Sequence, residues 1–456
     1  MIKTTIKVLC ILILLSGLLS DLRAQTPIQD TFAIPKKRFW RASGELFLSQ
    51  LVPWSYNYFV RNADFAKISF KSIGRNLNFS NWEWDDNHFK TNQFAHPYHG
   101  NLYFNSFRTN GYSFWQAAPA AFAGSYMWEV AGETHPAAPN DFVNTSLGGI
   151  ALGEMTYRLS NAIVNTRARG FSRQMQEVLA LLVNPVNGLN RILDGNWGRV
   201  YYNRDDSVKP RIVVTLDLGS RRFSEREEDV LDKGHNELYM RLRLQYGDPY
   251  AYSKKPFQHF TVQVEAGASD SAYLNAAQVN GNLVQWPFHE GEHSIVAGAI
   301  TMNYDYFHNS AFEYGGQSFT FRLNGVLKRN KPTAYTGYLA AGIIALAAVP
   351  DKYLYYGEGR DYDYGPGIAI NAGGNIVVKN KLTCTLGYRG GWFRTINGNS
   401  SSYFLNAASA EARYFIGRKI SIGMELGHFS VKGYYRDYDD VYRRYPFIRY
   451  SIGAVL

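Results

Sequence analysis

Residues 238–246 read Leu-Tyr-Met-Arg-Leu-Arg-Leu-Gln-Tyr, and this stretch decides the fold of the second half of the chain. Apolar residues at the even positions alternate with Tyr239, Arg241, Arg243 and Gln245 at the odd positions. Because successive residues of a β-strand point to opposite faces, the stretch predicts a strand with one apolar face and one polar face.

The same period of two recurs along the second half of the chain, in about twelve segments between Arg211 and Leu456. Clear examples are residues 212–219, 260–266, 382–388, 420–426 and 448–456. Alternation alone fits two architectures, because the apolar face can point outward into lipid or inward into the core of a soluble sandwich.

The connections between these segments separate the two architectures. Turns at residues 329–332, 379–381 and 417–419 are short, whereas the polar stretches 220–236, 350–364 and 428–445 are long. Residues 247–256 and 269–271 depart from this rhythm, being respectively too long and too short. Short turns on one side and long loops on the other are typical of outer-membrane barrels. We therefore predict an α+β membrane fold, in which an N-terminal helical segment precedes a transmembrane antiparallel β-barrel of about 12 strands at residues 210–456.

The N-terminus predicts export. A short basic stretch, an apolar run from Val8 to Leu19 and then Leu22-Arg23-Ala24 indicate a signal peptide at residues 1–24, cleaved before Gln25. The rest of the chain has no run of 18 apolar residues, which disfavours a membrane protein built of helices. We expect the mature protein in the outer membrane, with Cys384 as its single cysteine and hence no internal disulfide.

Composition narrows the class of partner. The net charge is +10, but lysine and arginine are scattered through turns and strands instead of forming one tract. Nucleic acid is an unsuitable partner for an exported chain, so outer-membrane lipid is the expected one. Aromatic residues make up 15% of the chain, which suits the aromatic girdles of a barrel and equally a soluble β-rich protein. The oligomeric state stays open.

The first half has a different, helical periodicity. We expect an amphipathic helix and a polar loop at residues 25–90, and a helical domain at residues 91–200. Within that domain the helix candidates are residues 91–109, 111–133, 148–164, 171–182 and 186–193, the last two being separated by Asn184-Pro185. Small residues between Ala117 and Ser125 allow neighbouring backbones to approach closely.

Polar residues on these helices are the chemically informative ones. Several are three or four positions apart, so they share a helix face. They are His96 with His99, Glu129 with Glu133, Glu154 with Arg158, and Asn140, Asp141 and Asn144 in the connection between helices. Charged groups on small, apolar helices are costly unless they are paired, so we expect several of these groups to contact one another.

Three interpretations of this group remain open: a structural network, a catalytic cluster and a metal site. In the structural interpretation, Glu129 or Glu133 pairs with Arg158, His99 meets a carboxylate, and Asn144 and Glu154 support the neighbouring helices. In the metal interpretation, the N/O ligand set is His96, His99, Glu129 and Glu133. No zinc-protease, nucleophile-elbow or phosphate-loop motif occurs in the sequence, so the cofactor is unknown.

The catalytic interpretation is hydrolysis of an ester. His99 or His96 would be the general base, oriented by Glu129 or Asp141. A water molecule, Ser113 or Ser125 would be the nucleophile, and Asn140 or Asn144 would donate to the oxyanion.

These residues also resemble a known family, the bacterial domain of unknown function 3943. The resemblance rests on several motifs in order: Asn92-Gln93-Phe94-Ala95-His96-Pro97-Tyr98-His99-Gly100, Ser125-Tyr126-Met127-Trp128-Glu129 with Glu133, Asn140-Asp141, Gly148-Gly149 with Gly153-Glu154, and Asn184-Pro185 through Leu189-Asn190-Arg191. It covers about 120 residues. The resemblance implies an exported protein of the outer envelope and carries no established activity.

Two functions follow from these expectations. One is a lipid-modifying hydrolase, a deacylase of lipid A or phospholipid. The alternative is a non-enzymatic plugged barrel for transport or envelope integrity, in which the helices plug or brace the lumen and Arg241, Arg243, Arg322 and Arg449 favour anionic solutes. A surface adhesin that uses the long Tyr/Asp-rich loops is a third hypothesis.

Overall fold

The computed structural model describes residues 36–200, 210–224, 234–267, 273–309, 313–327, 332–357 and 359–456. The predicted signal peptide and its cleavage point lie outside the described residues. Within these ranges the chain forms helices first and strands second, which is the predicted order.

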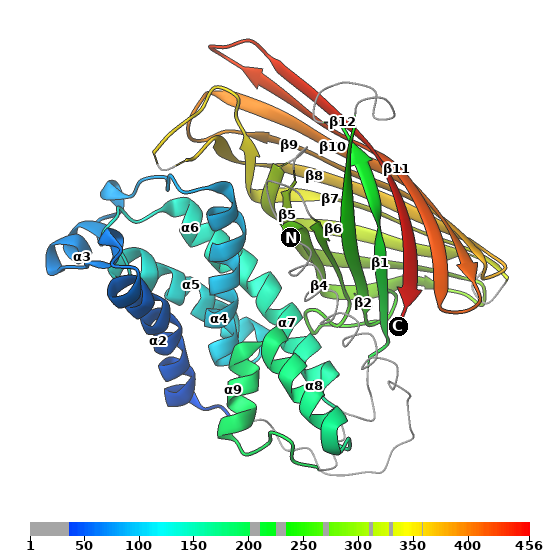
Figure 1. Cartoon of the computed structure of the whole chain (residues 1–456), viewed down its shortest axis with the longest axis horizontal. Coiled ribbons are helices and arrows are strands. Elements are labelled where there is room, and N and C mark those ends of the chain that lie inside the picture. The colour runs from blue at the N-terminus through cyan, green and yellow to red at the C-terminus, as the bar shows by residue number, and fades with distance from the viewer. Residues whose placement is uncertain are drawn as a thin grey trace.

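The strands form one closed barrel in which each strand pairs with its neighbours in sequence and β1 pairs with β12 (Figure 1). Every pairing is antiparallel, as in the register of Leu218 with Met240 on one side and with Ile452 on the other. The strands are β1 (Ile212–Phe223), β2 (His235–Tyr246), β3 (Phe260–Gly267), β4 (Leu274–Glu290), β5 (Ser294–His308), β6 (Glu313–Leu327), β7 (Thr333–Pro350), β8 (Tyr362–Val378), β9 (Leu382–Arg394), β10 (Ser401–Ile416), β11 (Ile420–Tyr435) and β12 (Val441–Val455). The predicted barrel of about 12 strands is confirmed.

The two faces of the barrel wall differ in polarity. Outward-facing side chains such as Leu218, Leu386 and Ile452 are apolar and largely exposed, while their neighbours Asp217 and Arg241 are buried inside. An apolar outer surface on a closed sheet is the arrangement that a lipid bilayer requires, because it leaves no unpaired strand edge in hydrocarbon. The fold is therefore a transmembrane β-barrel of the outer-membrane type.

Charged side chains of opposite sign fill one part of the lumen. Arg241 contacts Glu425 at 2.6 Å, and Arg243 contacts Glu411 at 2.6 Å. Asp217 accepts from Arg413 at 2.8 Å. Further pairs join Arg449 and Arg221 to Glu265. The arginines predicted to line the lumen on β2 and β12 are thus neutralised by carboxylates of the same wall.

Strands extend further than the sequence pattern indicated. The stretch 428–445 was predicted to be a long loop, but β11 continues to Tyr435 and β12 begins at Val441. Inward-facing aromatic side chains in this region, including Phe429, Tyr403 and Phe447, pack together. Because large side chains stand on both faces here, the alternation of polar and apolar residues is lost and the strands resemble a loop in sequence.

The helices precede the barrel, and most of them match the predicted helical stretches, whereas α3 and α6 form where no helix was predicted. They are α2 (Phe39–Ser55), α3 (Phe70–Asn76), α4 (His96–Arg108), α5 (Phe114–Ala131), α6 (Pro139–Val143), α7 (Gly149–Ile163), α8 (Gly170–Val183) and α9 (Pro185–Leu193), with the π-helical turns η1 (Tyr56–Val60), η4 (Thr91–Ala95) and η5 (Asn144–Gly148) and the 3-10 turns η2 (Asp64–Ala66) and η3 (Phe79–Asn81). None of the helices in the described ranges has both the length and the apolar character needed to cross a membrane.

Glycines allow α4 and α7 to cross at backbone contact. A Cβ atom on Gly149 would lie 2.6 Å from Cα of Gly100, and one on Gly100 would overlap the carbonyl of Thr145. On the same face of α7, a Cβ on Gly153 would meet the ring of Phe104. These glycines bring the N-terminal end of α4 next to η5 and the start of α7.

The helices lie against the outer wall of the barrel and not inside it (Figure 1). Ile300 of β5 faces outward and is exposed, and residues two and four positions further along the same face, Met302 and Tyr304, are buried against the helices. The hydroxyl of Tyr304 donates to the carbonyl of Gln93 at 2.7 Å. The hypothesis that helices plug the lumen is therefore wrong; they brace one side of the wall.

Candidate functional site

Three helix ends converge on one buried group of side chains. His96 is the first residue of α4, Glu129 lies in the last turn of α5, and Asp141 lies in α6. Their ligand atoms all lie within 4.8 Å of one another, and Nε2 of His96 is 3.6 Å from a carboxylate oxygen of Asp141. We call these three residues, with Asp85 and Glu133 beside them, the acid–histidine cluster.

Local sequence positions the two carboxylates. Pro139 starts α6 and leaves the preceding backbone extended, so that the amide of Ala138 donates to Glu129 at 2.8 Å. Asn140 then holds two acidic residues, because its amide nitrogen donates to Asp141 at 2.8 Å and its oxygen accepts from the backbone of Asp85 at 3.0 Å. Each carboxylate therefore keeps lone pairs that are not used by these bonds.

Burial dominates the electrostatics of the cluster. It raises the pKa of Glu129 to about 8, and it raises the pKa values of Asp141 and Glu133 well above their usual range. The nearby Asp85 reinforces all three shifts, because like charges oppose ionisation. Burial also lowers the pKa of His96. Without a cation, burial therefore favours the protonated, uncharged forms of Glu129, Glu133 and Asp141 and the neutral form of His96, and a bound cation would reverse the preference of the carboxyl groups.

His99 does not belong to the cluster. Its Nε2 lies 2.8 Å from the carbonyl oxygen of Ser49, and its ring contacts Tyr103 and Trp128. Burial lowers its pKa to about 4, so the neutral ring donates to that carbonyl. The predicted contact between His99 and a carboxylate is wrong. Of the predicted ligand set, His96 and Glu129 belong to the close group, which Asp141 completes, whereas His99 and Glu133 do not belong to it.

The other predicted residues have supporting positions. Glu154 is fully buried and pairs with Arg158 at 2.8 Å, as its spacing predicted, and also with Arg108 at 2.6 Å. The alternative pairing of Arg158 with Glu129 or Glu133 is wrong. Asn144 is buried next to the cluster-bearing segment and donates to the carbonyl of Asn92 at 3.1 Å, so it joins η5 to η4.

The two serines proposed as nucleophiles are poorly placed for that role. Ser113 precedes the first residue of α5 and thus lies at the opposite end of that helix from Glu129. Ser125 is buried, and its hydroxyl donates to the carbonyl of Phe142 at 3.4 Å. Of the three nucleophiles considered, water is the one that this geometry favours.

The barrel wall completes the surroundings of the cluster, a contribution that the sequence did not reveal. The hydroxyl of Tyr364 lies 3.2 Å from the amide nitrogen of Asn140, and that of Tyr362 lies 2.9 Å from the amide nitrogen of Asn92. Both tyrosines are fully buried at the start of β8. Asp85 was also missed, because the stretch Trp82-Glu83-Trp84-Asp85-Asp86 has the composition of a loop.

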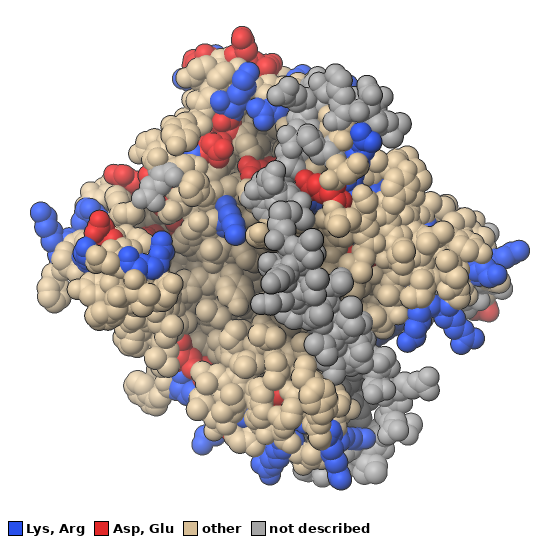
Figure 2. All heavy atoms as spheres, viewed as in Figure 1, with Lys and Arg blue, Asp and Glu red and all other residues tan. Residues whose placement is uncertain are grey.

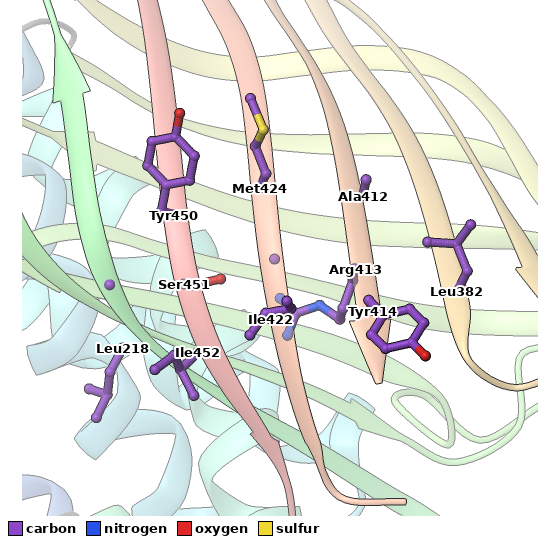
Figure 3. A pocket seen from close by; sticks show the side chains of 12 residues that line it. Leu218, Leu382, Ala412, Arg413, Tyr414, Ile422, Met424, Tyr450, Ser451 and Ile452 are labelled. Carbon is purple, nitrogen blue, oxygen red and sulfur yellow. The ribbon is translucent and has the colours of Figure 1, made fainter. Parts of the chain in front are cut away.

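A second concave feature lies elsewhere on the barrel. A cavity of about 540 Å³ opens on the outer face of strands β1 and β9 to β12, lined by apolar side chains such as Tyr414, Met424, Tyr450 and Ile452 (Figure 3). The strands that contact the helices are mainly β4, β5 and β6. The cavity and the acid–histidine cluster are therefore on different parts of the wall.

The chemistry of the donor set fits a divalent metal ion. One imidazole nitrogen and carboxylate oxygens from two residues match a three-residue catalytic site of the His/carboxylate type, in which a further position stays open for water. Within the described residues, His96, Glu129 and Asp141 are the group of histidine and acidic side chains with this spacing.

Solved structures of outer-membrane porins share the barrel architecture at low similarity. The NanC porin is 11% identical, with a TM-score of 0.29, and the match covers 52% of this chain and 98% of that one. The COG4313 outer membrane channel from Pseudomonas putida F1 is 9% identical, with a TM-score of 0.27 and coverage of 54% and 95%. At this level of sequence and structural similarity, the solutes of those channels say nothing about the function of this chain. No curated protein matches it.

The family comparison concerns the helical half. Residues 81–186 match the model of the Domain of unknown function (DUF3943), a range that includes all five residues of the acid–histidine cluster and stops before the barrel. The resemblance noted in the sequence is thus confirmed for residues 81–186, which match the DUF3943 model and carry this cluster beside an outer-membrane type of barrel.

Proposed function

We propose that the protein is an outer-membrane hydrolase that binds a divalent metal ion at His96, Glu129 and Asp141 and cleaves an ester bond of an envelope lipid. The single observation that supports it best is the convergence of these three side chains within 4.8 Å, in a buried setting that is unfavourable for the carboxylates without a cation. A cluster maintained at this electrostatic cost is more readily explained by a ligand than by stability alone.

The neighbouring residues supply the remaining parts of such a reaction. A metal ion lowers the pKa of a bound water molecule toward neutrality. Glu133 has no hydrogen bond or ion pair among the described residues, and a bound cation would favour its ionised form, whose carboxylate would then accept the proton of that water. With an ion held by His96, Glu129 and Asp141, the hydroxide oxygen would attack the ester carbonyl, the bond from carbon to alkoxy oxygen would break, and Glu133 would return the proton to the leaving alkoxide.

The place of the domain supports lipid as the substrate class. The helices pack against the outward face of the barrel, which elsewhere contacts lipid, so a lipid reaches the domain by lateral diffusion in the membrane. A soluble substrate would have no need of this arrangement.

The proposal is tested with the full-length protein in vesicles. After treatment with chelator and addition of Zn²⁺ or Mn²⁺, we expect about one ion per chain and release of fatty acid from a labelled lipid. His96→Gln and Asp141→Asn should lose both properties. His99→Gln is the matched control, because it changes the same residue type one helical turn away. The hydrolase proposal fails if the ion binds and no lipid in the envelope is cleaved, and the metal proposal fails if His96→Gln retains the ion.

A non-enzymatic role in transport or envelope integrity is the second candidate. The observation that favours it is the bracing of one barrel wall by helices whose ion pairs, such as Glu154 with Arg108 and Arg158, have no relation to the cluster. Identical lipid profiles in cells with wild-type protein, with the gene deleted and with Asp141→Asn would support this candidate.

A further inference from the structure

Once the periplasmic and the outer end of the barrel are identified, each part of the wall can be assigned to the inner or the outer leaflet of the membrane. β1 begins and β12 finishes at the same end, where residues 291–293, 379–381 and 417–419 form tight turns. The opposite end carries the connection between β7 and β8, described at residues 351–357 and 359–361, while the first end also carries one long connection, residues 247–259. In bacterial outer-membrane barrels, short turns lie in the periplasm and longer loops lie outside the cell. The start of β8 is therefore at the outer end of the barrel.

The acid–histidine cluster is fastened to that outer end. Tyr362 and Tyr364, the first and third residues of β8, bind Asn92 and Asn140 next to the cluster. Arg360, in the long connection before β8, donates to the carbonyl of Asp85 at 3.2 Å. These three contacts place the cluster at the level of the outer leaflet, far from the periplasmic turns.

An exposed surface of mixed character adjoins the cluster on the side away from the barrel. The amide of Asn76, the last residue of α3, donates to the carbonyls of Glu129 at 3.1 Å and His135 at 2.8 Å. On α3 and its flanks, Phe70 is 96% exposed and Phe79 is 67% exposed.

Two lysines lie close to Phe70 in the sequence, whereas the ring of Phe79 packs beside Trp82 and Tyr126. Lys67 and Lys71 are exposed, and Lys67 forms an exposed ion pair with Asp64 at 2.7 Å. Figure 2 shows Lys and Arg gathered over the region of α3. Exposed aromatic rings beside lysines suit the boundary between acyl chains and phosphate head groups, where lysine is attracted to anionic lipid.

We propose that the substrate is a phosphorylated, acylated lipid of the outer leaflet, whose phosphate is held by Lys67 and Lys71 while Phe70 and Phe79 enter its acyl region. This inference rests on the proposed function and adds the leaflet and the head-group charge. The position of the cluster at the outer end of the barrel indicates the outer leaflet, and the lysines indicate a negatively charged head group.

The leaflet is tested in intact cells with a membrane-impermeant maleimide. In a chain with Cys10 and Cys384 replaced by serine, Lys71→Cys should be labelled in intact cells, as should Asp437→Cys in the connection between β11 and β12. Arg418→Cys, in the turn between β10 and β11, should be labelled only after the outer membrane is permeabilised. Labelling of Lys71→Cys only after permeabilisation, or not at all, overturns the assignment to the outer leaflet.

The head group is tested with the full-length protein in vesicles that contain either lipid A or lipid A without its phosphates. We expect Lys67→Glu with Lys71→Glu to raise KM for the phosphorylated lipid by about 25-fold or more with kcat unchanged, because each of the two lysines near an anionic surface contributes about a factor of five to binding. The same charge reversals at Lys254 and Lys255, in the connection between β2 and β3, are the matched control.

The outcomes separate the two proposals. Hydrolysis of both lipids with equal KM, or an unchanged KM in the double variant, overturns the head-group inference and leaves the hydrolase in place. No hydrolysis of either lipid or of phospholipid by the metal-loaded wild type refutes the hydrolase itself, whatever the cysteine labelling shows.

Discussion

At the scale of single residues, the cluster illustrates why spacing identifies candidates and not contacts. His96 and His99 are three positions apart, so the sequence treated them as equivalent. In the structure α4 directs His96 to Asp141, whereas His99 reaches the backbone of Ser49 in α2. The partners of each ring come from helices far away in sequence. Asp85 was missed for the same reason, because only the fold brings that loop to the carboxylates.

The pH dependence of stability follows from one of these residues. The pKa of Glu129 is raised from 4.5 to about 8, so between these values the unfolded chain has released a proton that the folded chain retains. Folding then loses stability as pH rises from about 5 to 8. We expect the metal-free wild type to unfold at a lower temperature at pH 8 than at pH 5, monitored by the helical circular dichroism signal, and Glu129→Gln to reduce this difference.

Glu83→Gln is the control for that measurement, since Glu83 is exposed one residue before Trp84. A bound metal ion should abolish the loss of stability, because it favours the ionised carboxylates, and it should release protons on binding. A thermal transition of the wild type that is insensitive to pH between 5 and 8 would contradict the buried, protonated state of the cluster.

At the scale of elements, glycine positions decide how α4 and α7 meet. We expect Gly149→Ala to destabilise the helical domain by about 1–3 kcal/mol, the usual cost of forcing a methyl group into a packed contact. The new Cβ would lie 2.6 Å from Cα of Gly100, and backbone atoms cannot move aside as a flexible side chain can. Chemical denaturation of the full-length protein, followed at a helical wavelength, measures the difference.

Gly44 provides the matched control on α2. A Cβ at Gly44 meets no atom within 4 Å, and alanine is a better residue than glycine in a helix interior. Gly44→Ala should therefore be neutral or stabilise the protein by up to about 1 kcal/mol. A loss of stability for Gly44→Ala as large as that for Gly149→Ala would contradict the close-packing explanation, because a methyl group at Gly44 meets no neighbouring atom.

Element types were predictable because period and helix breaks are local properties. The break at Asn184-Pro185 separates α8 from α9 as expected, with Asn184 capping α9 through the amide of Asn187. The error at residues 428–445 arises where both faces of β11 and β12 carry large side chains, so that period two no longer reports the strand.

At the scale of the whole molecule, the position of the helices was the property that the sequence concealed. An outward-facing apolar residue has the same appearance in sequence whether lipid or a helix covers it. Ile300 and Tyr304 are on one face of β5, and only the structure shows the first exposed and the second buried against Gln93. The closed barrel was predictable because pairing follows chain order; the docked domain was not.

The occupied lumen leads to the last prediction, which concerns conduction. Because Arg241 contacts both Glu425 at 2.6 Å and Glu411 at 3.4 Å, side chains from β2, β10 and β11 join across the interior. Arg449 adds a second contact to Glu425 at 3.2 Å. We expect wild-type protein in a planar bilayer to show no stepwise conductance. Replacing both members of one pair, Arg241→Ala with Glu425→Ala, should produce steps, because it clears space without leaving either partner of that pair unpaired.

The control is Ile452→Ala, which shortens a side chain on the outward face of β12 and should leave conductance at zero. The helices lie outside the wall, so metal loading of the cluster should also have no effect on conductance in either variant. Conductance steps in the wild type would mean that ions pass through the lumen despite the ion pairs. Transport would then be the better-supported function, in place of hydrolysis. Silent wild-type and conducting double-variant traces would instead establish that the barrel wall, without any plug, closes the lumen.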